Sequence, residues 1–285
     1  MRTFLVGVTQ PDKQGVKDYL QFTGQLDFLQ SWDAATCGDQ LCLVSMFAKL
    51  CYRSLVLGKN ANVTRLRDIP DNIKSVIASG HGSVFEHVWL NFISTGVSRV
   101  FTHELVRHRV GTAFSQTSGR YVSIDKIDIV LPPELTDASV LLRCPNPFCA
   151  DGKLLHDEDA TACPVCNGKG QVPLPEFIQY EINEQGQMLK ELRDRLISEN
   201  MPFETKKKIT SAIRRLAPNG QDNEIGWSCN IRALRHMIIM RTSRHAEWEI
   251  RQVFNEVADI VLQRWPLMLH GLEKNEAGEW VGDSL

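Results

Sequence analysis

The pattern of apolar and polar positions predicts three strands. Residues 3–9 form a short apolar run that the turn-forming pair Pro11-Asp12 ends. Residues 88–97 are rich in β-branched and aromatic side chains, which favour a strand. Residues 121–131 alternate apolar and polar positions like a half-buried strand, and two prolines follow them.

Helices are expected along a larger part of the chain. Residues 41–57 are largely apolar and predict a buried helix, and 64–79 carry apolar residues at helical spacing, with Gly80 as the C-cap. A polar link is expected at 218–226. The same reasoning predicts further helices at 98–108, 175–200, 203–216, 230–242 and 245–268. These elements indicate an α/β (α+β) fold with more helix than strand.

The composition is that of a folded protein with a near-neutral charge. Of the 285 residues, 43% are apolar and 23% are charged, which excludes a disordered or fibrous chain. Lys and Arg total 32 against 34 Asp and Glu, and this balance argues against non-specific nucleic-acid binding. No stretch approaches the roughly 18 continuous apolar residues of a membrane span. Because no secretory signal is recognised either, we expect a cytoplasmic protein without a membrane partner.

Four of the eight cysteines lie in one short stretch that is poor in apolar residues. Cys144 and Cys149 are separated by four residues, Cys163 and Cys166 by two, and thirteen residues lie between the pairs. This spacing suits four thiolates around one tetrahedral Zn²⁺ in a closed, structural site. The alternative is four unrelated surface thiols. We therefore predict a zinc-ribbon-like insert at 143–173, with 1–142 and 174–285 forming the main domain.

A basic segment at the end of the helix predicted for 98–108 could bind an anion. One guanidinium group can bind two phosphate oxygens at once, and hydroxyls and loop amides can complete such a site. The alternative is a solvated basic helix end. The candidate residues are Arg107, His108, Arg109, Ser115, Gln116, Ser118 and Arg120.

Two other groups of residues could also bind a ligand. One is the segment from His81 to His87, for which the alternative is a core histidine and a capping box between Ser83 and Glu86. The other lies on apolar helices near the C-terminus, where solvent exposure is the alternative. If one helix ran through Arg241 and His245, their side chains would share a face.

Five separated segments together resemble the flavin-dependent thymidylate synthases. They are AKLCYRS at 48–54, SGHGSVFEH at 79–87, RHR followed by S-x-R-Y within 107–121, IRRLAP at 213–218, and NIRALRHMIIMRTSRHAEWEI at 230–250. The resemblance implies an antiparallel sheet flanked by helices, in a homotetramer whose active sites form between subunits. It also implies bound FAD that is reduced by NADPH. The implied reaction transfers a methylene group from methylenetetrahydrofolate to C5 of dUMP without a cysteine nucleophile, and gives dTMP.

The positions that match the family's motifs give residues their expected roles. FAD contacts are implied for His81, Ser83, Glu86, His108, Asn230, Arg232 and His236. Contacts with the dUMP phosphate and sugar are implied for Arg107, Gln116, Ser118, Arg120 and Arg214. Arg241 is expected at the uracil ring, so the expected catalytic residues are Ser118, Arg120 and Arg241. Arg109 is expected to be structural.

Several features depart from the family pattern. The link between RHR and Ser118 is one residue longer than usual, Gln116 replaces a frequent Glu, Glu104 a frequent Gln, and His236 a frequent Asn. Ordinary members also lack the cysteine-rich insert. Two alternatives therefore stay open. One is a related flavin and folate enzyme that makes another C5-modified pyrimidine nucleotide, such as hydroxymethyl-dUMP, and the other is a non-catalytic zinc-module binding protein.

Overall fold

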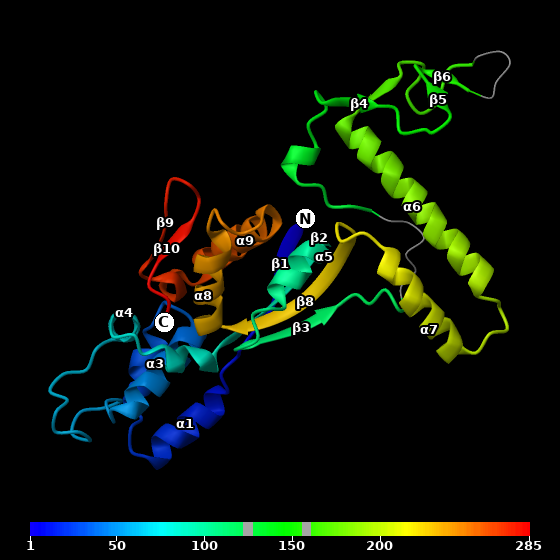
Figure 1. Ribbon diagram of the computed structural model, residues 1–285. Helices are drawn as coiled ribbons and strands as arrows, with labels where there is room; N and C mark the ends of the chain where they lie inside the picture. Colours follow the sequence, from blue (N-terminus) through cyan, green and yellow to red (C-terminus); the bar gives the residue numbers. More distant parts are fainter. Residues whose placement is uncertain (122–127, 156–160) are drawn as a thin grey trace. The chain divides into compact units, whose positions relative to one another are not determined.

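A computed structural model describes residues 1–121, 128–155 and 161–285, and it divides the chain into two compact units (Figure 1). The first unit contains residues 1–95, 101–115 and 224–285. The second contains residues 96–100 and 116–223, so the cysteine-rich segment lies within it. None of the helices in the described ranges combines the length and the apolar character needed to cross a bilayer.

A four-stranded sheet, most of which belongs to the first unit, has the strand order β1-β2-β8-β3. Strand β1 (Arg2–Val8) pairs antiparallel with β2 (Trp89–Ser98), with an irregularity between Leu5 and Gly7. The other two strands are β8 (Asp222–Asn230) and β3 (Thr112–Gln116). Alternate residues of β2, including Leu90 and Phe92, point into the core.

Helices and a C-terminal hairpin complete the first unit. Helix α8 (Ile231–Thr242) packs against α9 (Trp248–Arg264) and against the 3₁₀ helix η1 (Gly82–His87). Strands β9 (Leu272–Lys274) and β10 (Trp280–Gly282) form the antiparallel hairpin. The remaining helices are α1 (Lys13–Phe22), α2 (Phe28–Asp33), α3 (Asp39–Cys51), α4 (Ile69–Ala78), α5 (Arg99–Leu105, mostly in this unit) and the 3₁₀ helix η4 (Pro266–Leu269).

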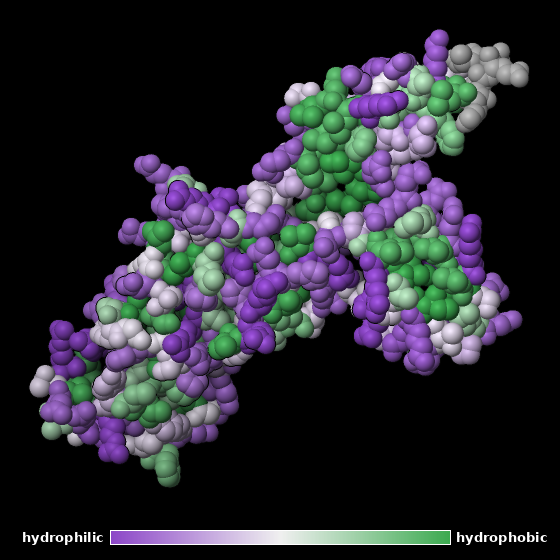
Figure 2. Space-filling model, viewed as in Figure 1, coloured by the Kyte–Doolittle hydropathy of each residue, from purple (hydrophilic) through white to green (hydrophobic). Residues whose placement is uncertain are grey.

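The second unit is built around the long helix α6 (Leu174–Leu196) and the shorter α7 (Phe203–Ile213). Their small core contains Ile182, Leu189 and Ile213. Figure 2 shows apolar side chains gathered over the first turns of α6 and again where α6 and α7 pack together. The shorter elements are η2 (Pro133–Leu135), β4 (Leu141–Arg143) paired with β7 (Gln171–Pro173), β5 (Cys149–Ala150) paired with β6 (Lys153–Leu154), and η3 (Arg214–Leu216).

The structure confirms the fold class, the strands expected at 3–9 and 88–97, and helices in every region where they were expected. The prediction of a polar link at 218–226 is wrong, because β8 begins at Asp222 and includes the second half of this segment. Several elements were not predicted: β3, the C-terminal hairpin, α1 and α2. For the strand expected at 121–131, residues 122–127 lie outside the described residues, and Ile129 forms an isolated bridge with Gln221.

Several helices are shorter than expected, because capping signals and turns set their ends. The helix expected at 64–79 begins at Ile69, since the Asp68 carboxylate accepts a hydrogen bond from the Asp71 amide and Pro70 occupies the first turn. The helix expected at 41–57 ends at Cys51, and Arg53 then takes a positive φ of 48°. Helix α5 ends at Leu105, so His108 lies beyond it.

We expect the core of the first unit to be sensitive to loss of one ring. Phe92 stacks on Trp227 at 4.6 Å and is 1% exposed, so Phe92→Ala should lower the free energy of unfolding by about 3–5 kcal/mol. Phe22, which is 92% exposed, provides the matched control. Phe22→Ala should change the free energy of unfolding by no more than about 0.5 kcal/mol. Urea denaturation of both variants measures the difference, and equal losses would contradict the assigned core.

Candidate active site and metal centre

A cleft of about 940 Å³ opens in the first unit between the end of α3, the end of α4 and the start of η1. Its size is typical of a pocket for a small molecule or cofactor. Three residues expected at the flavin, His81, Ser83 and Arg232, line this cleft.

The lining of the cleft is rich in cationic side chains. Lys49, Arg65, Arg67 and Arg232 contribute to it, and none of the described lining residues is an Asp or a Glu. Lys49 is only 2% exposed, and its Nζ donates a hydrogen bond to the Arg67 carbonyl at 2.5 Å. Burial lowers the pKa of Lys49. This charge distribution favours an anionic ligand.

The turn after α4 places His81 at the rim of the cleft. Gly80 has a φ of 68°, and the amides of Gly80 and His81 donate to the carbonyls of Ile77 and Val76, in the pattern of a Schellman motif. The predicted glycine turn is thus present. The phenol oxygen of Tyr52 lies 3.4 Å from Nδ1 of His81, and the two rings are stacked.

Glu86 forms an ion pair with Arg232 at 2.6 Å. The capping box considered between Ser83 and Glu86 is therefore wrong, because the Glu86 carboxylate binds a guanidinium from α8. The core-histidine alternative is wrong as well. Both His81 and His87 are exposed, and His87 stacks on Phe47 with the ring centroids 3.9 Å apart. Each side chain of the Glu86–Arg232 pair is 45% exposed, so solvent screens the interaction.

A second group of side chains surrounds the guanidinium of Arg241. Its Nη1 donates to the Glu104 carboxylate at 2.8 Å, and its Nη2 donates to the Glu104 carbonyl at 3.2 Å. Its Nε donates to Nε2 of His108 at 2.7 Å. Glu104 is a site residue that was not predicted, because in the sequence it stands out only as a departure from a frequent Gln of the family.

These contacts determine the protonation of His108. Because Nε2 accepts a hydrogen bond from Arg241, the proton of the neutral ring is on Nδ1. Burial, followed by the charges of Arg241 and His236, lowers the pKa of His108 to about 4. The His236 ring lies 6.2 Å from the His108 ring, so these two expected flavin ligands are neighbours.

Asn230 is buried and caps α8, because its side-chain oxygen accepts a hydrogen bond from the Ala233 amide at 2.8 Å. Gly111 packs against this side chain with a φ of 69°, and a Cβ there would lie 2.5 Å from the Asn230 Nδ2. Arg241 and His245 do not share one helix, because α8 ends at Thr242 and α9 begins at Trp248. Asn230 and Arg241 thus lie near opposite ends of the same helix.

The second unit carries four of the residues expected to bind the nucleotide, namely Gln116, Ser118, Arg120 and Arg214. The Arg120 amide donates to the Ser118 hydroxyl at 3.4 Å. The Arg120 guanidinium lies 5.6 Å from the Tyr121 ring centroid. Burial, followed by the charge of Arg214, lowers the pKa of Arg99.

The two arginines of the RHR segment, Arg107 and Arg109, lie in the first unit and are exposed. The Arg107 Nε donates to the His103 carbonyl at 3.3 Å. The nucleotide-binding role of Arg107 and the structural role of Arg109 stay predictions.

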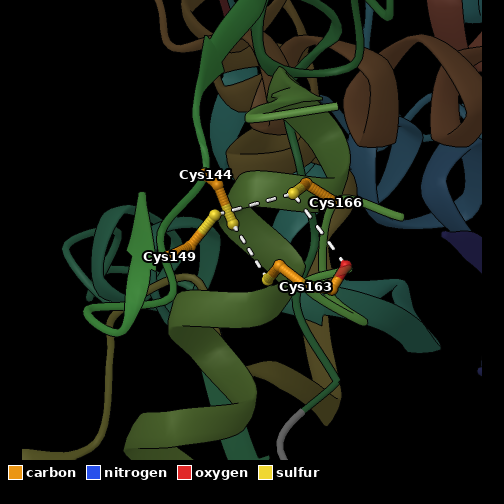
Figure 3. Close-up of side chains that lie close together, drawn as sticks. All are labelled: Cys144, Cys149, Cys163 and Cys166. Atoms are coloured by element: carbon orange, nitrogen blue, oxygen red, sulfur yellow. Dashed lines mark hydrogen bonds between the residues drawn. The ribbon is translucent and has the colours of Figure 1, made fainter. Parts of the chain in front are cut away.

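The four clustered cysteines point toward one another (Figure 3). Their sulfur atoms lie within 4.8 Å of one another, with 3.9 Å between Cys144 and Cys163 and 3.7 Å between Cys149 and Cys166. A tetrahedral zinc with Zn–S bonds of about 2.3 Å requires S···S distances of about 3.8 Å, whereas a disulfide requires about 2.05 Å. All eight cysteines are free. The donor set and its spacing thus fit one tetrahedral metal ion.

Two tight turns place the sulfurs of this cysteine cluster. Asp151 and Gly152 follow Cys149 with positive φ, and Asn167 and Gly168 follow Cys166 in the same way. The turns approach closely, since a Cβ on Gly152 would lie 2.1 Å from the Gly168 carbonyl oxygen. The Gly170 amide donates to the Cys166 sulfur at 3.3 Å, as is typical around metal-binding thiolates.

Sequence comparisons identify relatives that span most of the chain. The model of the family described as thymidylate synthase complementing protein matches residues 35–267. A flavin-dependent thymidylate synthase from Mycobacterium avium is 30% identical over 82% of this chain and 81% of its own length. A flavin-dependent thymidylate synthase from Clostridium tetani is 29% identical over 75% of each chain.

Two solved structures share the fold. One is a UMP/dUMP methylase, PolB, from Streptomyces cacaoi bound with 5-Br dUMP, with a TM-score of 0.52 and 19% identity over 94% of this chain and 92% of that one. The other is thymidylate synthase X from Helicobacter pylori with FAD and dUMP, with a TM-score of 0.51 and 16% identity over 95% of this chain and 100% of that one.

The arrangement around Arg241 predicts the titration of His108. Its pKa should be near 4, with the proton of the neutral ring on Nδ1, and Arg241→Ala should raise the pKa toward the ordinary histidine value of about 6.5. Since the folded-state pKa lies below the unfolded one, His108 contributes stability above about pH 6.5 that is lost as the pH falls toward 4. NMR titration of the imidazole nitrogens measures both properties. An ordinary pKa of His108 in the wild type would contradict the buried contact between His108 and Arg241.

Proposed function

The chain belongs to the thymidylate synthase complementing protein family, whose relatives named above are flavin-dependent thymidylate synthases, and we propose how its residues serve that activity. It is an enzyme of this class, which uses FAD to methylate dUMP to dTMP. The matched range, residues 35–267, contains the residues of the cleft and of the Arg241 cluster.

FAD is proposed to bind through His81, Ser83, Glu86, His108, Asn230, Arg232 and His236. The observation that carries this assignment is the cleft, where His81, Ser83 and Arg232 meet a lining that contains no described carboxylate. The diphosphate of FAD is anionic, so Lys49, Arg65 and Arg67 of the same cleft suit it electrostatically. Sequence reasoning missed these three residues, although two arginines in a polar loop before a helix were an available signal.

The residues proposed to bind dUMP are those that match the family's motifs, namely Arg107, Gln116, Ser118, Arg120, Arg214 and Arg241. The proposed role of Arg214 at the phosphate rests on its match to the family's motif.

The catalytic contribution of the chain is positioning and charge stabilisation. Arg241 is held in place by Glu104 and His108, and its remaining N–H groups can donate to the carbonyl oxygens of the uracil ring. Ser118 and Arg120 are proposed as the other two catalytic residues. When bound, FAD reduced by NADPH supplies a hydride, and methylenetetrahydrofolate is the proposed carbon donor. No cysteine nucleophile is proposed.

Segment 143–173 is proposed to be an inserted module that holds one structural Zn²⁺, with 1–142 and 174–285 as the synthase domain. Four thiolates leave no coordination position open for catalysis. Among the described residues, the module's core consists of Cys144, Cys149, Cys163, Cys166 and Val172, which supports a folding role for the metal.

The resemblance also supports a homotetramer as the proposed assembly. We propose a cytoplasmic location as well, since all eight cysteines are free, which fits a reducing compartment.

We expect the holoenzyme to form dTMP from dUMP in the presence of FAD, NADPH and methylenetetrahydrofolate. Mass spectrometry of the nucleotide should show the gain of one methyl group. A hydroxymethyl product would instead support the alternative activity on dUMP. A protein that cannot be reconstituted with FAD would sink the proposed function, and absorbance at flavin wavelengths checks this independently of turnover.

Freshly purified, reduced protein should contain one zinc per chain. Cys163→Ser removes a sulfur that is fully buried and should abolish stoichiometric zinc. Cys51→Ser is the matched control, because Cys51 is exposed and free, and it should retain the metal. Elemental analysis measures zinc in both variants, and full zinc content in Cys163→Ser would refute the assignment.

A further inference from the structure

The Glu104–Arg241 pair joins two helices that are distant in the sequence. Glu104 lies in the last turn of α5, and Arg241 lies in the last turn of α8. The pair is partly buried, because the side chains are 29% and 15% exposed, respectively. Glu104 binds the guanidinium through both its carboxylate and its backbone carbonyl.

We propose that Glu104 is a positioning residue that fixes the Arg241 guanidinium for its contact with the pyrimidine ring. This inference rests on the proposed function, which places Arg241 at the uracil. Glu104 itself acts through Arg241.

The geometry of the guanidinium supports this role. Arginine has five N–H donors in a rigid plane, and three of them are used by Glu104 and His108. Two N–H groups are left with a fixed orientation, so the side chain enters a ligand contact with most of its rotamer freedom already lost. A misplaced group of this kind costs roughly 10²-fold in rate for an error of about 1 Å.

The charges of the cluster point to the same role. His108 accepts from Arg241 as a neutral ring, so it orients the guanidinium without neutralising it. The Glu104 carboxylate supplies the negative charge that lets Arg241 remain partly buried. The backbone carbonyl of Glu104 would remain in any variant, and therefore the carboxylate is the feature to test.

Kinetics of the holoenzyme test the carboxylate. Glu104→Ala should reduce kcat/KM for dUMP by about 10²-fold while flavin occupancy stays unchanged. Glu104→Gln retains an oxygen acceptor for Nη1 and should recover at least about tenfold of that loss. Glu191→Gln, which changes an exposed glutamate near Arg195 on α6, is the matched control and should behave as wild type. Wild-type kinetics in Glu104→Ala would overturn the proposal.

A double-mutant cycle separates positioning from general destabilisation. If Glu104 acts through Arg241, Glu104→Ala should weaken dUMP binding in the wild-type background and have no further effect in the Arg241→Ala background. Calorimetry on the holoenzyme measures dUMP affinity for all four proteins, after circular dichroism shows that each is folded. Additive losses would mean that Glu104 acts independently of Arg241, and would overturn the proposal.

The His108 resonance gives a readout that does not depend on turnover. Releasing Arg241 in Glu104→Ala should raise the pKa of His108 above its wild-type value, because a positive charge moves away from the ring. A pKa at or below the wild-type value in Glu104→Ala would show that Arg241 keeps its place without the carboxylate, and would overturn the proposal. If the wild type forms no methylated nucleotide, the proposed function fails, and this NMR result still decides whether Glu104 positions Arg241.

Discussion

The cost of burying a guanidinium determines how the C-terminal third of the first unit is assembled. Arg235 on α8 is fully buried, and it donates to the carbonyls of Met268, His270 and Asp283. Burial lowers the pKa of Arg235 to about 10. A charge in this position is tolerated only when hydrogen bonds replace its water. The segment that follows α9 is therefore fastened to α8, the same helix that carries Arg232 and Arg241 toward the candidate site.

Elements with strong apolar periodicity could be predicted from the sequence, whereas elements defined by their tertiary environment could not. Strand β8 alternates buried and exposed positions, but one buried position is Asn223 and Gly226 interrupts the pattern, so the segment has the composition of a loop. Strand β3 is only five residues long and carries no fully buried side chain. Both are strands because they pair with neighbours in the four-stranded sheet.

The cysteine cluster could be predicted from local sequence spacing, whereas the arginine–carboxylate pairs could not. The four cysteines lie within 23 residues, so their spacing alone predicted a tetrahedral arrangement, and the structure brings the sulfurs together. The ion pairs Glu86–Arg232 and Glu104–Arg241 join residues 146 and 137 positions apart. Local spacing instead suggested that Glu86 would cap a helix with Ser83. Which carboxylate meets which arginine depends on how α8 packs against η1 and α5, and no motif contains that information.

The second unit distributes its stability differently from the first. Its described hydrophobic clusters are small, one between α6 and α7 and one formed by the four cysteines with Val172. Phe177, in the first turn of α6, packs against the cysteine cluster, so the cluster and the long helix are joined at that point. Chains with little apolar surface to bury need a cross-link or a metal to fold stably. A metal held by the cysteines would thus stabilise the start of α6 as well as the loops around it, and this gives a physical reason for an inserted segment to retain four thiolates in a protein whose proposed chemistry uses none.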